Sequence, residues 1–206
     1  MDRPLYILHN RAMPWGDYGD ILLSGMTAHL DRENGLLQLE RAGPFVPPIA
    51  ITGFDARGYS HIVVTEAYRA LLEDSGLSGL RFLPVAKKRI VYLDWQLWDQ
   101  MADQPAEYPE GDEPEAYILV RPHDPGIADQ MGLLWEVCLE IHARTERKHL
   151  GSGRWDEDIY VAGASWDGTD WFRAAGVGYI YVSEDARRWL ERTASEWITL
   201  KPAHVR

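Results

Sequence analysis

The residues of this chain that could do chemistry are a cysteine, two histidines and a group of carboxylates, all in its last third. Cys138 and His142 are four positions apart, so on a helix they could ligate one metal ion, with His149 as a third ligand. The carboxylates could hold Mg²⁺ in a divalent-metal hydrolase; they are Asp156, Glu157, Asp158, Asp167 and Asp170. The simpler interpretation makes Cys138 a small apolar side chain and the acids solvated turn residues. We therefore assign no metal ligand and no cofactor.

Two glycine-containing stretches lack the spacing that catalysis or phosphate binding requires. Residues 163–168 (GASWDG) do not place a serine between glycines as a nucleophile elbow does. Gly176 and Gly178 have no third glycine and precede a strand, whereas a dinucleotide-binding loop follows one. We therefore expect no enzymatic activity. The alternative is a hydrolase that uses Asp156, Asp158, Asp167 and Asp170.

An acidic segment, residues 94–115, is the strongest candidate for binding a partner. It holds eight acids, three prolines and no lysine or arginine, so much of the net charge of −11 is concentrated there. Aromatic anchors beside acids are typical of a surface that binds a cationic protein. The expected partner-binding residues are Trp95, Trp98, Asp99, Asp103, Glu107, Tyr108, Glu110, Asp112, Glu113 and Glu115. Two alternatives remain: the segment is only a solvated loop, or Trp95, which follows a strand, belongs to the core.

The elements that position these residues include a sequence repeat. Residues 54–84 and 172–202 align without a gap at an offset of 118, with ten identities in 31 positions. In each copy a β-branched or aromatic run precedes Thr65 or Ser183, a hydroxyl suited to cap a helix, and an apolar segment then runs into a proline. Each copy is therefore predicted to be a strand-helix-strand unit.

A long helix is predicted over about 125–148. Asp124 is suited to the N-cap and Pro125 to the first helical position, and apolar residues follow at intervals of four and three up to Thr145. The predicted fold class is α+β, with a mixed or antiparallel sheet, the two pseudo-repeated units and this helix packed across the sheet. One domain of residues 1–206 is expected; an alternative is two lobes, 1–93 and 117–206, joined by the acidic segment.

The composition limits the partners and the compartment. The chain of 206 residues has an ordinary globular balance of 46% hydrophobic and 26% charged residues. Its acidic charge argues against binding nucleic acid. A single cysteine excludes an internal disulfide, and no apolar run approaches the length of a signal peptide or a membrane span. We therefore expect a cytoplasmic protein that binds neither nucleic acid nor membrane.

The repeated unit resembles the immunity proteins of bacterial polymorphic toxin systems, in particular the immunity-11-like and double-CXXCG group. Residues 62–85 carry the resemblance, as do residues 167–172 and 189–191. The resemblance covers about a third of the chain and implies a cytoplasmic, non-enzymatic protein that binds and neutralises a cognate toxin. One cysteine cannot supply either CXXC motif, so the zinc site of that group is not carried over. A structural subunit with a constant partner is a further alternative.

Overall fold

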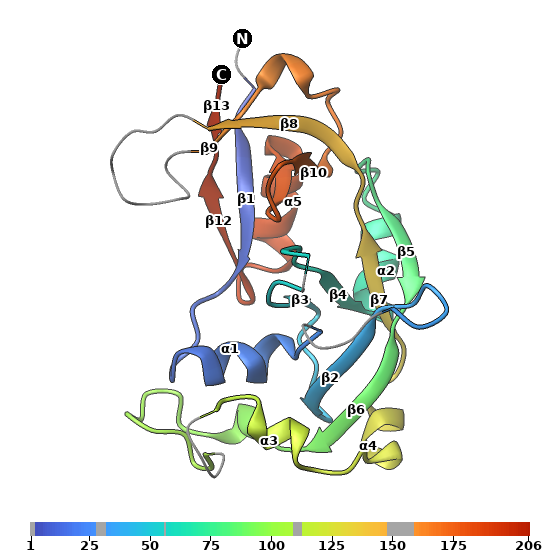
Figure 1. The fold of residues 1–206 in the computed structure, drawn as a ribbon, viewed down its shortest axis with the longest axis vertical. Coiled ribbons are helices and arrows are strands. Elements are labelled where there is room, and N and C mark those ends of the chain that lie inside the picture. The colour runs from blue at the N-terminus through green and yellow to red at the C-terminus, as the bar shows by residue number, and fades with distance from the viewer. Residues whose placement is uncertain (1–2, 28–31, 56, 109–112, 148–158) are drawn as a thin grey trace.

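The structure is a computed structural model that describes residues 3–27, 32–55, 57–108, 113–147 and 159–206. It confirms the α+β class (Figure 1). The described strands are β1 (Leu5–Asn10), β2 (Gln38–Gly43), β3 (Ile49–Ile51), β4 (Ile62–Thr65), β5 (Arg81–Pro84), β6 (Ala86–Tyr92), β7 (Leu134–Cys138), β8 (Ile141–Arg147), β9 (Ile159–Val161), β10 (Trp171–Ala175), β11 (Ile180–Ser183), β12 (Ile198–Pro202) and β13 (His204–Val205). The α-helices are α1 (Asp17–Ser24), α2 (Glu66–Glu73), α3 (Ala116–Leu119), α4 (Pro125–Gln130) and α5 (Glu184–Thr193).

The described strands form three sheets. A seven-stranded mixed sheet has the order β12-β1-β11-β10-β8-β9-β13, a four-stranded antiparallel sheet has the order β3-β4-β7-β5, and β2 pairs with β6 in parallel. In Figure 1 the larger sheet and α5 lie at the end of the molecule that carries both termini, while α1, α3 and α4 lie at the opposite end. The four-stranded sheet lies between them.

The two repeats fold as predicted. The strand β4, the helix α2 and the strand β5 correspond to β11, α5 and β12, and the starts of both helices differ by the sequence offset of 118. Thr65 Oγ1 accepts a hydrogen bond from the Tyr68 N–H, and Ser183 Oγ accepts one from the Ala186 N–H, so both caps form. The first residues of the repeats are not equivalent, because the hairpin loop before β4 (52–61) is longer than the loop before β11 (176–179).

Each unit takes its middle strand from the other half of the chain. Unit A consists of β3, β4, α2 and β5, and β7 pairs antiparallel between β4 and β5. Unit B consists of β10, β11, α5 and β12, and β1 pairs antiparallel between β11 and β12. Because β1 precedes unit A in sequence and β7 precedes unit B, the two repeats have exchanged their first strands. The units therefore do not coincide with residues 1–93 and 117–206.

The register of the exchanged strands is the same in both units. Trp135 of β7 lies opposite Val64 and Pro84, and Tyr6 of β1 lies opposite Val182 and Pro202, which are the partners expected from the offset of 118. Each middle strand thus lies between the two strands of a strand-helix-strand unit, as in a split β-α-β motif.

Equivalent side-chain contacts also occur in the two units. Trp135 Nε1 donates to Glu66 of α2, and the Tyr6 hydroxyl donates to Glu184 Oε2 of α5 at 2.7 Å. Arg69 and Arg187 lie over these two rings, at 4.6 and 5.1 Å from the centroids.

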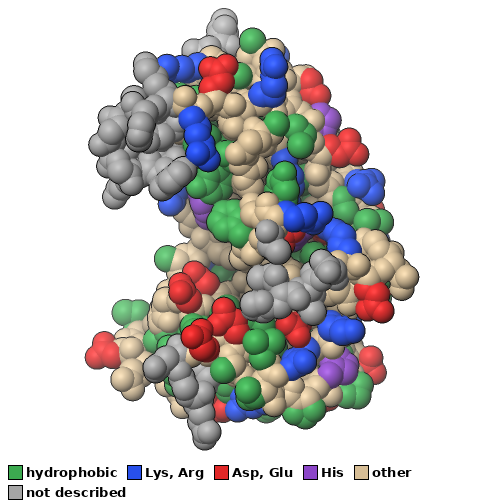
Figure 2. Space-filling model, in the orientation of Figure 1, with side chains coloured by type: hydrophobic (Ala, Val, Ile, Leu, Met, Phe, Trp, Pro, Cys, Tyr) green, Lys and Arg blue, Asp and Glu red, His purple; other side chains and the backbone are tan. Residues whose placement is uncertain are grey.

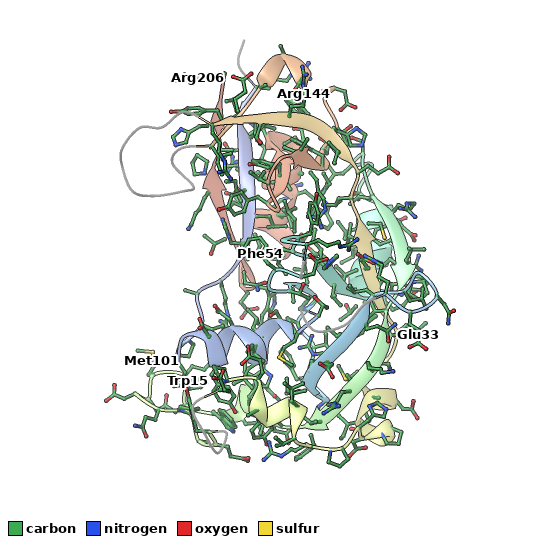
Figure 3. The ribbon with its side chains drawn as sticks, in the orientation of Figure 1. Trp15, Glu33, Phe54, Met101, Arg144 and Arg206 are labelled. Atoms are coloured by element: carbon green, nitrogen blue, oxygen red, sulfur yellow. The ribbon has the colours of Figure 1, made fainter. Side chains whose placement is uncertain are left out.

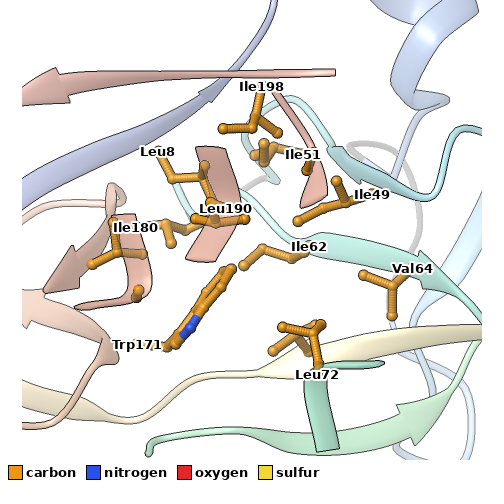
Figure 4. Close-up of a cluster of buried hydrophobic side chains, with 14 of the residues drawn as sticks. Leu8, Ile49, Ile51, Ile62, Val64, Leu72, Trp171, Ile180, Leu190 and Ile198 are labelled. Carbon is orange, nitrogen blue, oxygen red and sulfur yellow. The ribbon is translucent and has the colours of Figure 1, made fainter. Parts of the chain in front are cut away.

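One hydrophobic cluster joins the units (Figure 4). Ile62 and Val64 of unit A have Ile180 and Val182 as their counterparts, and all four are at most 1% exposed. Further matched pairs in this cluster include Leu72 with Leu190 and Val137 with Leu8. Apolar burial contributes about 25 cal/mol per Å², so this shared core couples the two units energetically.

The predicted long helix over 125–148 is wrong. Only α4 forms, with Asp124 as its N-cap and Pro125 in its first turn, and Gly132 with a φ of 67° follows its end. Residues 134–147 form β7 and β8 instead, because β7 completes the sheet of unit A and its hydrogen bonds override the helical spacing. No helix in the described parts of the chain is long and apolar enough to cross a membrane.

The strand exchange predicts that neither half of the chain folds alone. We would cut the chain in the turn between Arg121 and Pro122, which separates β1 and unit A from β7 and unit B. Fragments 1–121 and 122–206 should each lack cooperative thermal unfolding, because β4, β5, β11 and β12 would have unpaired edges. Mixed together, they should regain the circular dichroism and elution volume of the intact chain. Cooperative unfolding of either fragment as a monomer would contradict the exchange.

Candidate interaction surface

Trp95 anchors the acidic segment to the protein and is not exposed on its surface. It begins a short 3₁₀ helix (Trp95–Leu97), is 0% exposed, and packs edge-on against Phe45 at a centroid distance of 5.5 Å. The cluster that surrounds it includes Tyr18 and Leu93. The prediction that Trp95 binds a partner is therefore wrong, because a side chain buried in this core cannot reach one.

The other two predicted anchors also pack against the protein. Trp98 is half-buried against Trp15, with ring centroids 5.8 Å apart, and Trp15 Nε1 donates to the carbonyl oxygen of Ala102 at 3.0 Å. Tyr108 packs against Tyr18 at 4.9 Å but keeps 53% of its surface exposed. Residues 98–108 of the segment are thus held against α1 and the turn before it, where Figure 3 labels Trp15 and Met101.

The described acids of the segment face solvent. Asp99, Asp103, Glu107 and Glu113 are exposed and Glu115 is partly exposed. None of these five forms a salt bridge with a described lysine or arginine. Glu110 and Asp112 lie outside the described residues. These five carboxylates are therefore not neutralised by a described lysine or arginine.

Glu107 has a local role as well. It accepts a hydrogen bond from the Tyr117 hydroxyl at 2.9 Å, and burial together with this bond raises the pKa of Tyr117 to about 12.

Two apolar residues of the segment were not among the predicted site residues. Leu97 is 78% exposed and Met101 is 91% exposed. The exposure of Leu97 could have been predicted from the spacing of Trp95 and Trp98. A 3₁₀ helix has three residues per turn, so when both tryptophans face the protein, Leu97 faces solvent. Tyr92 and Val120, 56% and 78% exposed, lie on the adjoining β6 and directly after α3. Exposed apolar side chains beside unpaired acids form a candidate protein-binding surface.

The residues considered for metal binding do not assemble a site. Cys138 lies on β7 and His142 on β8, and His142 Nδ1 is 2.7 Å from Asp167 Oδ2. Burial raises the pKa of Cys138 to about 11, so its thiol stays protonated at neutral pH. His149 lies outside the described residues. Within the described part of the chain, no three His, Cys, Asp or Glu residues are grouped to hold a metal ion.

The carboxylates of the hydrolase alternative have structural partners where they are described. Asp170 Oδ2 accepts from the N–H and the hydroxyl of Ser78, at 2.9 and 2.8 Å, and Asp170 Oδ1 accepts from Ser183 Oγ at 2.6 Å. Asp170 thereby ties the loop after α2 to unit B. Asp167 accepts from the Thr169 hydroxyl and backbone. Asp156, Glu157 and Asp158 lie outside the described residues.

A buried ionic network in unit A was not expected from the sequence. His61 Nδ1 is 3.0 Å from Glu136 Oε1, and His61 Nε2 is 3.2 Å from Asp55 Oδ2. Both ring nitrogens of His61 thus have a carboxylate oxygen, a hydrogen-bond acceptor, as their partner. Arg32 adds a bidentate pair to Glu136, whose Oε2 is 2.7 Å from Nη1. The network fixes the 52–61 loop to β7.

The network controls the ionisation of its acids. Burial alone would raise the pKa of Glu136, but hydrogen bonds from His61 and Arg32 outweigh it and lower the pKa to about 2. The pKa of Asp55 is also lowered: its hydrogen bonds from Tyr59, Arg57 and His61 outweigh desolvation. His61 thus joins Asp55 of the loop to Glu136 of β7, an arrangement that stabilises the loop against the sheet.

Searches with this chain against protein-family models, curated proteins and solved structures return no match. The function therefore has to be inferred from the surface of the chain itself.

The Glu136 network predicts loss of stability in acid. A carboxyl whose pKa is lower in the folded protein stabilises it above the unfolded value, here 4.5, and that stability is lost as the pH falls towards 2. The unfolding free energy from urea titrations should therefore decline across this range. Replacing Glu136 by Gln should flatten the decline and destabilise the protein at pH 7, since removing one partner of a buried pair costs roughly 3–5 kcal/mol.

Glu73→Gln provides the matched control, because Glu73 belongs to an exposed ion pair with Arg69 on α2. At pH 7 the unfolding free energy of the Glu136→Gln variant should be clearly lower than that of the Glu73→Gln variant. Equal acid dependence of Glu136→Gln and the unmodified protein would show that the network does not control acid stability.

Proposed function

We propose that this protein is a cytoplasmic, non-enzymatic inhibitor that neutralises a cationic protein toxin by binding it. The observation that carries the proposal is the pair of highly exposed apolar side chains, Leu97 and Met101, among unpaired acids on a segment anchored by Trp95. The resemblance of the repeated units to immunity proteins of polymorphic toxin systems supports the same function.

The two kinds of side chain would act at different stages of binding. The carboxylates of the segment create a negative field that accelerates the encounter with a cationic surface, and salt screens that field. Leu97 and Met101 lose their exposed apolar surface only in the docked complex, so they slow dissociation. No described lysine or arginine forms a salt bridge with Asp99, Asp103, Glu107, Glu113 or Glu115, so their negative field can act on the partner.

The surface extends beyond the segment. A standard interface buries about 800 Å² on each partner, more than Leu97, Met101 and the acids present. Tyr92 and Val120 are exposed on neighbouring elements and are candidates to contribute further apolar area. The helix that begins at Glu66, α2, does not adjoin the segment, because Figure 1 shows it well separated from the end where α1 and α3 lie.

Substitutions should separate the two contributions. The triple variant Asp99→Asn, Asp103→Asn and Glu113→Gln should slow association and weaken its salt dependence. Leu97→Ala combined with Met101→Ala should mainly speed dissociation, by about tenfold, as truncation of interface anchors does. The measurement is surface plasmon resonance at two salt concentrations against the product of the adjacent upstream gene, together with rescue of cells that express that product.

Leu71→Ala is the matched control, since Leu71 is 53% exposed on α2, away from the segment. It should bind as the unmodified protein does. Unchanged association of the triple variant at low salt, with unchanged dissociation of the Leu97 and Met101 variant, would show that residues 94–115 are only a solvated loop.

A further inference from the structure

The hairpin loops of the two units pack against each other. The loop 52–61 joins β3 to β4, and the loop 176–179 joins β10 to β11. Phe54 and Tyr179 are in edge-on ring contact at 6.2 Å. A Cβ atom on Gly178 would lie only 1.7 Å from the carbonyl oxygen of Gly58, so the backbones meet at a distance that only glycine permits.

Arg173 holds this junction together. It lies on β10, is 9% exposed, and donates to the carbonyl oxygens of Gly178 in its own unit, at 3.2 Å, and of Ser60 in the other. Its guanidinium also lies over the Tyr59 ring, 5.2 Å from the centroid. The strand pairings make Ile51 its counterpart in unit A, so the repeated fold itself does not require an arginine here.

A hollow opens on each side of the junction. One has a volume of about 480 Å³ and extends towards β1, β12 and α1. The other, of about 610 Å³, lies against Arg57, Ile159 and Val177. Phe54 and Tyr179 line both, so the hollows share an aromatic wall, and we refer to them together as the loop groove. Volumes of this size suit a ligand. Figure 2 shows the molecule hollowed between its two ends.

The charge of the loop groove is opposite to that of the protein. The whole chain has 21 lysines and arginines against 32 acids. Among the described residues, the groove is instead lined by four cations and one acid: Arg11, Arg57, Arg147, Lys201 and Asp20. Arg57 also forms an ion pair with Asp55, whose Oδ2 is 3.0 Å from Nη2. Lys201 is exposed and forms no ion pair with a described residue. Phe54 is 52% exposed at the shared wall.

We propose that the loop groove binds an extended acidic peptide segment that carries an apolar side chain. A carboxylate of the segment would pair with Lys201 in one hollow, and an apolar side chain would pack on Phe54. In the other hollow a second carboxylate would contact Arg57, which already forms an ion pair with Asp55. An occupant of both hollows has to pass over Phe54 and Tyr179, which favours an extended chain over a compact ligand. A nucleic acid strand fits less well, because it carries a charge on every phosphate and needs a cation for each, whereas a peptide with spaced carboxylates needs few.

This groove lies outside residues 94–115. The acidic segment and the loop groove share no residue, so either proposal can fail without the other.

The test uses the intact chain and a labelled peptide that alternates glutamate and leucine around a central tryptophan. Binding should shift the amide signals of residues 8–12, 52–60, 176–180 and 199–201 in two-dimensional NMR spectra. Lys201→Glu and Phe54→Ala should each weaken binding about tenfold. Both side chains are exposed, so the variants should keep the thermal stability of the unmodified protein.

Lys88→Glu is the matched control, since Lys88 is an exposed lysine on β6, outside the groove. It should bind the peptide normally, and a peptide with lysine in place of glutamate should not bind. The proposal is overturned if the acidic peptide shifts no groove signals, if Lys201→Glu and Phe54→Ala bind normally, or if the lysine peptide binds equally well. Stronger binding of oligothymidylate at the same signals would overturn the peptide assignment.

Discussion

The exchange of middle strands between the two repeats is the constraint on which the rest of this structure depends. Without β7, the strands β4 and β5 have no partner between them, and without β1 the same holds for β11 and β12. The chain must therefore cross between the units. It does so again where β7 is followed by β8, which pairs with β10 of unit B. The hydrophobic cluster shared by both units depends on this interlocking, because Val137 and Leu8 lie on the exchanged strands.

The buried network and the two surfaces proposed to bind partners are features that the two repeats do not share. Glu136 and His61 of the buried network correspond to Ile7 and Tyr179 in unit B, so the fold forms without those charges. Arg173 at the loop junction corresponds to Ile51. The acidic segment falls outside both units. In contrast, the helix caps and the Glu66–Arg69 and Glu184–Arg187 ion pairs occur twice, as expected for groups that stabilise the unit itself.

The sequence predicted those parts of the fold that local chemistry determines. Thr65 and Ser183 start their helices because a hydroxyl cap acts within one turn, and Asp124 with Pro125 starts α4 for the same reason. The exposure of Asp99 and Asp103 also followed from charge alone.

Contacts between residues distant in sequence determined the parts of the structure that were not predicted. Residues 134–147 have apolar spacing that fits a helix, but β7 forms a strand because it pairs with β4 on one side and β5 on the other. Trp95 was predicted to bind a partner, with the core as the alternative because it follows a strand, and the structure supports that alternative. Its contacts with Phe45 and with the cluster around Tyr18 involve residues distant in sequence. The loop groove was not foreseen for the same reason, because it is formed by two hairpins that only the folded chain brings together.

Hydrogen exchange of the intact protein tests the strand exchange most directly. A strand without neighbours on both sides exchanges rapidly, whereas a central strand is protected. The account predicts that amides of Tyr6, Ile7 and Leu8 exchange as slowly as those of Ile180, Tyr181 and Val182, at a rate shared with β7. Rapid exchange of β1, with β11 and β12 still protected, would contradict the claim that each repeat is completed by the first strand of the other.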